Sequence, residues 1–415
     1  MAIKRLYVKN FKSFKELDVE LGKFNVLIGP NASGKSNFVH IFKFLRDIAK
    51  HGIDNAVSMQ GGVKYLRNMK IGSSEDLKIS VDFDEEIRKF HELSIEKNNK
   101  KYFIKFKNIK RYEFIMKFKK RGDGFKSIKE TVRIKCEFLN EKHEKIGSGE
   151  VVYSLIDGKF KEKLNNKPDE FPEINSLLIP ISDSLPKHIT LLQIAPLIPP
   201  MLPIYEYISN IGIYDIDPKL SKMATQITGK IELEEDGSNL PIVLRNIIAS
   251  KDKKRKLYNL INDLLPYVHD LKVEKFEDKS LFFKLKESYF ENKYIPASLI
   301  SDGTINITAL IIAMYFEKKP LTIIEEPERN IHPYLISRIV NRMKEVSSHR
   351  KQIIVTTHNP EMVKYAGLDN ILIVTRDKDG FSTISRPNKE KIEIFLKNDI
   401  GIEELYVKNI LGALK

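Results

Sequence analysis

The segment from Gly29 to Ser36 has the residue types and spacing of a loop that binds nucleotide phosphates. It reads GPNASGKS and fits the pattern G-x-x-x-x-G-K-[ST] at every position. Glycines let backbone N–H groups point at phosphates, and a helix N-terminus adds partial positive charge. We expect Lys35 to neutralise the β- and γ-phosphates and the Ser36 hydroxyl to bind Mg²⁺. A chance match on a glycine turn is the alternative. The predicted nucleotide contacts here are Gly29, Pro30, Asn31, Ala32, Ser33, Gly34, Lys35, Ser36 and Asn37.

Two carboxylates, Glu325 and Glu326, end an apolar stretch that begins at Leu321. An acid at the carboxyl end of a strand beside a phosphate loop lies near the metal ion and the attacking water. We predict that Glu325 holds Mg²⁺, directly or through water, and that Glu326 is the general base that polarises the attacking water. The alternative is a solvated strand end that happens to be acidic.

Two further motifs carry polar groups at the ends of apolar patterns. His358 follows the buried pattern QIIVTT, on a strand that we expect beside the acidic one. Its imidazole could hydrogen-bond the γ-phosphate and the attacking water, whereas most lone histidines after strands are structural. Ser301 precedes an apolar helical pattern, so we predict that it caps that helix, and Gly303 allows close backbone approach. The helix start would be a second anion site, although an ordinary helix cap explains the same residues.

The elements that must position these groups follow from the periodicity of the sequence. Phe24–Ile28 is almost wholly apolar, as in a buried strand, and residues 37–49 have helical spacing. Period-two alternation over residues 77–160 predicts an antiparallel sheet. The pattern over residues 221–264 predicts helix. From residue 300 onward helix and strand alternate, which predicts a parallel α/β sheet.

The composition excludes several classes of protein. The chain has 415 residues, 42% of them hydrophobic, which suits two or three domains with a sizeable core. Its single cysteine, Cys136, excludes a disulfide scaffold and a cysteine-ligated metal site within one chain, and fits a cytoplasmic setting. We expect no secretion and no membrane partner, because neither a signal-peptide pattern nor a membrane-spanning apolar run is present. The net charge of +14 favours a polyanionic partner such as nucleic acid; a lysine-rich solvated surface is the alternative.

The set and order of these motifs resemble the ABC-type ATPases of the SMC/RecF/OLD branch, also described as AAA-family or RecF-like ATPases. The similarity lies mainly in residues 1–75 and 230–370. Its clearest stretches are VKNFKSFKELDVEL, GPNASGKSNF, LEEDGSNLPIVL, PASLISDGT, EEPERNIHP and VTTHNPEMV. The closing GIEELYVKNILGAL resembles the tail of stand-alone members.

The resemblance implies a fold and a domain order. The fold would be α/β, a P-loop ABC-type ATPase head with an antiparallel β subdomain and an inserted, mainly helical region. We predict an N-terminal ATPase lobe over residues 1–165, the insert over 166–290 and a C-terminal ATPase lobe over 291–415. Because sustained heptads are absent, we expect no long coiled-coil arms. The chain after His358 is too short for a Toprim nuclease domain, so we expect a stand-alone member.

The resemblance also implies a mechanism with ATP and Mg²⁺ as substrate and cofactor. Two heads would dimerise head to tail around two ATP molecules. Ser301 and Gly303 of one chain would reach the γ-phosphate bound by Lys35 of the other. The D-loop would lie at Arg329-Asn330, at the dimer interface. Gln60 is the candidate Q-loop glutamine, with a surface loop residue as the alternative.

Two residue types depart from the wider ABC pattern. Glu325 stands where an aspartate is usual, and Asp302-Gly303-Thr304 replaces a Gly-Gly-Gln-like signature. This branch tolerates both, so we do not interpret them as inactivating. Asp215 and Asp217 have the Asp-x-Asp spacing of a nuclease motif, but they precede the signature, and we interpret them as loop or cap residues.

Three functions are compatible with these residues. The first is an ATP-hydrolysing dimer that acts on DNA or on a separate nuclease or effector, in DNA repair or phage defence. The second is an ATP-gated DNA clamp in which hydrolysis only resets binding. Another P-loop class, such as a kinase or small GTPase, agrees less well with Ser301 and His358. The basic strands from Lys97 to Arg121 are the first candidate DNA surface, with a solvated lysine face as the alternative. Lys251, Lys253, Lys254 and Arg255 are a second, weaker candidate.

Overall fold

The structure of the chain is a computed structural model. It describes residues 1–84, 92–97, 99–120, 122, 124–172, 185–227, 229–276, 279–290, 293–349, 351–396, 400–408 and 411. The chain forms two compact units. The first unit comprises Met1–Gly22, Asn31–Ile211 and Val374–Ile384, and the second comprises Lys23–Pro30, Gly212–Ile373 and Ser385–Lys415. The phosphate loop therefore starts in the second unit and ends in the first. The three domains with limits at residues 165 and 290 remain a prediction.

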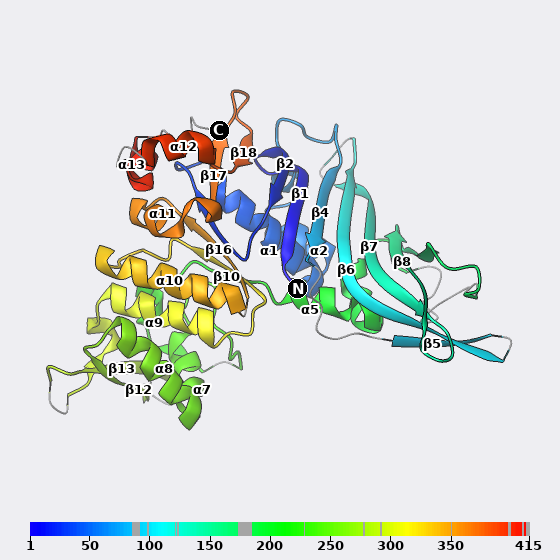
Figure 1. The fold of residues 1–415 in the computed structure, drawn as a ribbon. Coiled ribbons are helices and arrows are strands. Elements are labelled where there is room, and N and C mark those ends of the chain that lie inside the picture. The colour runs from blue at the N-terminus through cyan, green and yellow to red at the C-terminus, as the bar shows by residue number, and fades with distance from the viewer. Residues whose placement is uncertain are drawn as a thin grey trace. The chain divides into compact units, whose positions relative to one another are not determined.

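The first unit contains a large antiparallel sheet. Its strand order is β2-β1-β4-β6-β7-β8-β9, with β5 paired to β6 (Figure 1). Every neighbouring pair is antiparallel, which confirms the period-two prediction. The strands are β1 (Ile3–Phe11), β2 (Phe14–Glu20), β4 (Leu77–Phe83), β5 (Glu92–Lys97), β6 (Lys100–Phe118), β7 (Phe125–Leu139), β8 (Lys145–Ile156) and β9 (Lys159–Asn165).

The helices of this unit include α1, which packs on the sheet. α1 begins directly after Gly34, whose φ of 119° suits glycine, and ends before Gly52, whose φ is 80°. The ring of Phe44 packs against Phe11 of β1 and Phe114 of β6, with centroid distances of 6.0 and 5.8 Å. The helices are α1 (Lys35–His51), α2 (Ile53–Met59), α3 (Val63–Leu66), α4 (Leu191–Ile194) and α5 (Leu202–Ser209), with 3₁₀ turns η1 (Ala195–Leu197) and η2 (Pro199–Met201).

A buried carboxyl joins α4 to the sheet. Glu130 of β7 is fully buried and accepts hydrogen bonds from the Tyr112 hydroxyl, at 2.5 Å, and from the backbone N–H of Leu191. Burial raises the pKa of Glu130 to about 7, although both hydrogen bonds favour the ionised form. Protonation of this side chain therefore couples to the folding of the first unit.

The second unit is built around a parallel sheet, as predicted. Its strands follow the order β10-β15-β16-β3-β17, and β18 pairs with the end of β17, which belongs to the first unit. All residues of β3 and β16 are buried, because helices cover both faces of such sheets. The strands are β3 (Phe24–Ile28), β10 (Gly212–Tyr214), β15 (Leu321–Glu325), β16 (Gln352–Thr357), β17 (Ile371–Arg376) and β18 (Ser382–Ser385).

One hydrophobic core joins this sheet to its helices and to a small antiparallel sheet, β11-β13-β12 with β14 on β13. Helices α8, α9 and α10 run side by side in Figure 1. The helices are α6 (Pro218–Ser221), α7 (Leu240–Ile248), α8 (Lys251–Leu264), α9 (Asp302–Tyr315), α10 (Pro333–His349), α11 (Pro360–Ala366), α12 (Lys389–Leu396) and α13 (Ile402–Val407), with 3₁₀ turns η3 (Ala297–Leu299) and η4 (Leu368–Asn370). The small strands are β11 (Thr225–Gln226), β12 (Val268–Phe276), β13 (Ser280–Glu287) and β14 (Ile295–Pro296).

The helical prediction for residues 221–264 is only partly right. α7 and α8 are helical, but the described residues between α6 and α7 form β11 and turns. Asn239 accepts a hydrogen bond from the backbone N–H of Glu234 at 2.8 Å, and Asp236 accepts one from Ser238 at 2.9 Å. Such side-chain acceptors offer the backbone an alternative to helix, which explains the error.

Candidate nucleotide-binding site

The three motif strands of the second unit are direct neighbours. β15 pairs with β16 and β16 pairs with β3, and both pairs are parallel. Glu325 is in register with Thr356, and Thr357 is in register with Ile28. Because parallel strands end at one edge of a sheet, the residues that follow them lie along that edge. The sheet thus brings together the acidic pair, His358 and the start of the phosphate loop.

Glu326 is the centre of a charged network at this edge. Its Oε1 lies 3.0 Å from Nδ1 of His358, and its Oε2 accepts a hydrogen bond from Nη2 of Arg329 at 3.2 Å. Nη1 of Arg329 lies 3.0 Å from Oδ1 of Asp215. Both carboxylate oxygens of Glu326 are therefore engaged, and Asp215, which we had interpreted as a loop or cap residue, anchors the arginine.

The electrostatics keep Glu326 ionised. Burial by itself would raise the pKa of its carboxyl, but the hydrogen bond from Arg329 and the neighbouring His358 outweigh burial, so the pKa lies below its ordinary value. The backbone is also unusual, because Glu326 has a φ of 44°. Its N–H still donates to the Thr356 carbonyl at 2.8 Å. Backbone strain held in this way is common at functional sites.

The second half of the phosphate loop is supported inside the first unit. Ser382 donates from its hydroxyl to the Ser33 carbonyl at 2.6 Å, and its Oγ lies 2.8 Å from Oγ of Ser13. Asn37 donates to the same Ser13 oxygen at 2.8 Å. A Cβ on Gly34 would lie 2.2 Å from the Ser382 hydroxyl oxygen, so this position has room only for glycine. Buried serines therefore fix the loop from behind.

Two residues that the sequence did not single out also contact the loop. Within the first unit, Nε of Arg376 donates to the Ala32 carbonyl at 3.0 Å, where Ala32 itself has a φ of 60°. Within the second unit, the Tyr406 hydroxyl hydrogen-bonds the backbone of Gly29. Tyr406 lies in the closing segment that supported the resemblance, and that similarity was its only signal. Ser13 also lies in a stretch that supported the resemblance, whereas Ser382 and Arg376 gave no signal because they are far from the loop in sequence.

The signature segment packs against the predicted D-loop of its own chain. Ser301 caps α9, as predicted: its Oγ accepts from the Thr304 N–H at 3.2 Å. A Cβ on Gly303 would lie 2.5 Å from the carbonyl oxygen of Asn330. Asn306 donates to the Arg329 carbonyl at 2.7 Å. The close backbone approach expected at Gly303 is therefore made by its own D-loop, and its contact with a partner's nucleotide remains a prediction.

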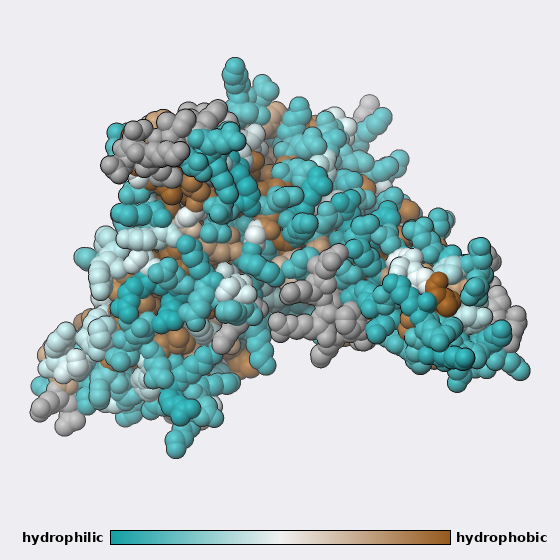
Figure 2. Space-filling view, viewed as in Figure 1, coloured by the Kyte–Doolittle hydropathy of each residue, from teal (hydrophilic) through white to brown (hydrophobic). Residues whose placement is uncertain are grey.

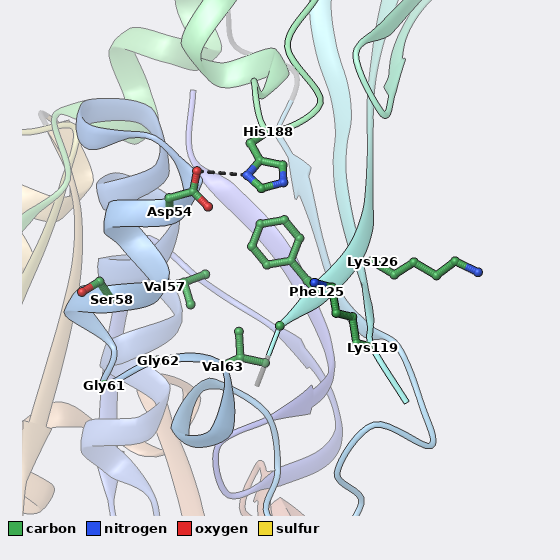
Figure 3. Close-up of a pocket in the computed structure, with 11 residues that line it drawn as sticks. Asp54, Val57, Ser58, Gly61, Gly62, Val63, Lys119, Phe125, Lys126 and His188 are labelled. Atoms are coloured by element: carbon green, nitrogen blue, oxygen red, sulfur yellow. Dashed lines mark hydrogen bonds and ion pairs between the residues drawn. The ribbon is translucent and has the colours of Figure 1, made fainter. Parts of the chain in front are cut away.

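Gln60 ends α2 in the first unit and is buried, with 6% of its surface exposed. It does not line the hollow of about 750 Å³ beside it, which Gly61 and Gly62 border. Among the lining residues, Oδ2 of Asp54 lies 3.1 Å from Nδ1 of His188, and Figure 3 shows these two side chains joined while Lys126 extends away from them. The polar groups do not converge on one point, so this hollow lacks the features of a phosphate site.

The predicted basic strands show the alternation that we expected. Ile104, Phe106, Met116 and Phe118 are buried, with the lysines between them on the other face. Many of the basic side chains on these and neighbouring strands pair with carboxylates. The ion pairs are Lys107–Glu137 at 2.6 Å, Lys110–Glu150 at 2.7 Å, Lys145–Glu137 at 3.1 Å, Lys78–Glu113 at 2.7 Å and Arg111–Asp82 at 2.5 Å. Arg121, which ends the predicted basic surface, lies outside the described residues.

The residues present fit a nucleotide triphosphate with Mg²⁺. The loop has left-handed backbone at Ala32 and Gly34, a conformation that turns N–H groups toward an anion, and α1 begins at Lys35. Ser36 in the first unit and Glu325 in the second unit each carry an oxygen of the hard kind that Mg²⁺ prefers, and their joint role in a metal site remains a prediction. Within the described residues no three His, Cys, Asp or Glu side chains form a metal cluster. Mg²⁺ sites that rely on substrate phosphates and water need no such cluster.

Comparison with known proteins gives the family. A family model described as "AAA domain, putative AbiEii toxin, Type IV TA system" matches residues 24–364. The match covers most of the chain, so the chain belongs to this family of AAA domains. The chromosome partition protein Smc of Methanocaldococcus jannaschii is 44% identical over 46 residues, which are 11% of this chain and 4% of that protein. The chain therefore matches only a small part of that relative.

One solved structure supports the assignment of the fold, and a second is reported for comparison. A structure of an "SmcHead bound to the C-winged helix domain of ScpA" covers 95% of this chain and 99% of its own, with 18% identity and a TM-score of 0.50. The SMC head domain from Thermotoga maritima is 15% identical, covers 94% of this chain and 100% of its own, and has a TM-score of 0.42.

The chain therefore belongs to this AAA-domain family, and its fold is that of an SMC-like P-loop ATPase head. The resemblance and the fold class predicted from the sequence are thus confirmed.

In the described part of the chain no helix is long and apolar enough to cross a membrane. On the face drawn in Figure 2 hydrophilic side chains predominate and the apolar ones form small scattered patches.

Proposed function

We propose that this chain binds and hydrolyses ATP with Mg²⁺, and that two copies pair around two ATP molecules. The observation that supports this best is the shared strand edge. β3, β16 and β15 are adjacent and parallel, and the residues that directly follow them are Gly29, His358 and Glu326. A phosphate loop, an imidazole and an ionised carboxylate on one edge are the parts that phosphoryl transfer to water needs.

Each predicted residue has a role in this proposal. Lys35 and the loop N–H groups bind the phosphates, while Ser36 and Glu325 hold Mg²⁺, which neutralises phosphate charge when bound. Glu326 accepts a proton from water as the water oxygen bonds to the γ-phosphorus and the bond to the leaving ADP oxygen breaks.

His358 supplies a further contact near the γ-phosphate in this proposal. Its Nδ1 faces Glu326, so its Nε2 is the nitrogen left to reach the γ-phosphate or the water. Ser301 and Gly303 would complete the nucleotide site of the partner copy, and Gln60 is the proposed Q-loop residue. These two assignments follow from the family motifs.

The direct test of nucleotide binding is Lys35→Ala. We expect it to abolish ATP binding, measured by equilibrium dialysis with labelled ATP, because the phosphate charge would be left uncompensated. Lys23→Ala is the matched control, since Lys23 precedes β3 outside the phosphate loop, and it should bind ATP normally. Normal binding by Lys35→Ala would reject the proposed site.

We further propose that pairing is transmitted to DNA or to a separate nuclease or effector, as in DNA repair or phage defence. The net charge of +14 supports an acidic partner. In the ATP-gated clamp, the alternative, the protein alone would bind DNA with a steep salt dependence. An effector-coupled ATPase would bind DNA weakly and hydrolyse slowly until triggered.

If DNA binds, α8 is a better candidate than the basic strands. Lys251 and Lys253 of α8 are exposed, and among the described residues neither forms an ion pair, whereas Lys107 and Lys110 of β6 pair with carboxylates. Charges that are already neutralised contribute little to phosphate binding. A clamp should therefore lose more affinity for duplex DNA in Lys251→Glu/Lys253→Glu than in a matched double reversal at Lys107 and Lys110. Equal losses would reject this ranking.

A further inference from the structure

A buried carboxyl group lies behind the strand edge and has no role in the reaction proposed above. Glu328 follows the acidic pair by two residues, and only 7% of its surface is exposed. Its Oε1 accepts a hydrogen bond from the hydroxyl of Thr357, which is fully buried at the end of β16. Its Oε2 is buried and has no hydrogen-bond partner within the described part of the chain.

The hydrogen bonds continue from Thr357 into the turn that carries His358. Oγ1 of Thr357 accepts from the backbone N–H of Asn359 at 2.9 Å. Oδ1 of Asn359 in turn accepts from the N–H of Glu361 at 2.8 Å and caps α11. The two neighbours of His358 are thus both held by hydrogen bonds: Thr357 is bonded to the buried Glu328, and Asn359 is bonded to Thr357 and to the start of α11.

His358 itself has little to hold it. Its side chain is 57% exposed, and its contact with Glu326, at 3.0 Å, joins it to another side chain at the same edge. An exposed side chain samples several rotamers unless its backbone and its partners restrict it. The chain of hydrogen bonds from Glu328 supplies the restriction on the backbone.

We propose that Glu328 is a positioning residue for His358, acting through the Thr357 hydroxyl and the Asn359 N–H to fix the turn that presents the imidazole to Glu326. This proposal rests on the proposed ATP hydrolysis, because its consequence for turnover needs that reaction.

The cost of burying Glu328 argues against a role in folding alone. A buried carboxyl with one oxygen unpaired lowers stability, and an apolar side chain of similar size would cost less. Burial accordingly raises the pKa of Glu328. A buried carboxyl that lowers stability is expected where it keeps functional side chains in a fixed geometry, here next to Glu326 and His358.

The test compares two buried threonines of the same parallel sheet. Thr357→Val removes the hydroxyl that links Glu328 to the turn. Thr322→Val is the matched control, because Thr322 is fully buried on β15 and its hydroxyl has no partner within the described residues. We expect Thr357→Val to lower kcat about 10-fold with the Kd for ATP unchanged within about twofold, and Thr322→Val to change neither.

Two variants of Glu328 separate positioning from packing. Glu328→Gln keeps an oxygen that can accept from Thr357, so kcat should stay within about threefold of the parent value. Glu328→Ala should lose as much as Thr357→Val, and the double variant Thr357→Val/Glu328→Ala should lose no more than either single change, because both break one chain of bonds. Additive losses, or equal effects of Thr357→Val and Thr322→Val, would overturn the proposal.

A readout that does not need hydrolysis keeps this test separate from the proposed function. In ¹³Cε1-histidine NMR spectra, the His358 signal is assigned by its absence in His358→Gln. That signal should shift or broaden in Thr357→Val and stay in place in Thr322→Val. An unchanged signal in Thr357→Val would reject the positioning role, whether or not ATP is hydrolysed. A changed signal in a chain that never hydrolyses ATP would instead reject the proposed function.

Discussion

The antiparallel sheet of the first unit and the strand edge of the second unit use charge in opposite ways. On the sheet, pairs such as Lys107–Glu137 lie between neighbouring strands at the surface. On the strand edge, Glu326, Arg329 and His358 converge on one point. Exposed ion pairs contribute little to stability or chemistry, whereas charges gathered in a partly buried cluster shift one another's pKa. The position at which charged side chains converge therefore says more about function than the net charge of +14 does.

Removal of a carboxylate should therefore lower ATP turnover at the strand edge of the second unit but not on the antiparallel sheet of the first unit. Glu326→Gln should lower ATP turnover about 100- to 10,000-fold, because the base would be lost, while ATP still binds. Glu137→Gln is the matched change on the sheet and should leave turnover within about twofold of the parent. Steady-state release of phosphate measures both. Normal turnover by Glu326→Gln would show that another group is the base.

The buried carboxyl of the first unit provides a contrast in pH dependence. The pKa of Glu130 is about 7 in the fold, above its ordinary value near 4.5. Between these values the folded state holds a proton that the unfolded state has released. The contribution of Glu130 protonation to the free energy of unfolding is therefore fully present below about pH 4.5. It is lost as the pH rises from there through about 7, which lowers the free energy of unfolding by up to about 3 kcal/mol.

The variant Glu130→Gln tests this directly, since its amide can still accept from Leu191 and donate to Tyr112. Urea midpoints for the parent chain and the variant should be compared at about pH 5 and about pH 8. The urea midpoint of the parent chain, relative to that of Glu130→Gln, should be lower at about pH 8 than at about pH 5. A difference that is constant with pH would contradict the raised pKa.

A backbone contact in the second unit gives a smaller effect. Gly303→Ala would place a Cβ 2.5 Å from the Asn330 carbonyl oxygen, so we expect a loss of about 1–3 kcal/mol in the free energy of unfolding. Gly229→Ala is the control, because a Cβ there meets nothing within 4 Å. Urea unfolding measures both. Equal stabilities of the two variants would show that the signature segment does not pack on its D-loop as described.

The sequence predicted most of the fold and the main motifs for clear physical reasons. Buried strands such as β3 and β16 are continuous apolar runs, and the period-two pattern of β6 separates a core face from a lysine face. The prediction of helix for the segment before α7 was wrong, because Asn239 and Asp236 accept hydrogen bonds from backbone N–H groups that a helix would use.

The supporting residues of the site could not be predicted. Ser382 is separated from Ser13 by most of the chain, and a lone serine such as Ser382 has no periodicity or motif to mark it. Arg329 was placed in the D-loop by resemblance, but its ion pairs with Glu326 and Asp215 depend on tertiary structure. The roles of all the predicted site residues at a nucleotide, from Lys35 and Ser36 to Glu326 and His358, remain predictions, as do those of Gln60, Ser301 and Glu325.

The central claim, that ATP draws two copies of this head together, is tested most directly by the mass of Glu326→Gln in solution. The variant should be measured by light scattering after size exclusion, with and without Mg-ATP, and then with duplex DNA. We predict a monomer without nucleotide and a dimer with Mg-ATP, because bound ATP is no longer consumed. A dimer strengthened by DNA would favour the clamp, and one indifferent to DNA would favour a protein effector. A mass that never changes with Mg-ATP would contradict the claim and remove the proposed role of Ser301 and Gly303.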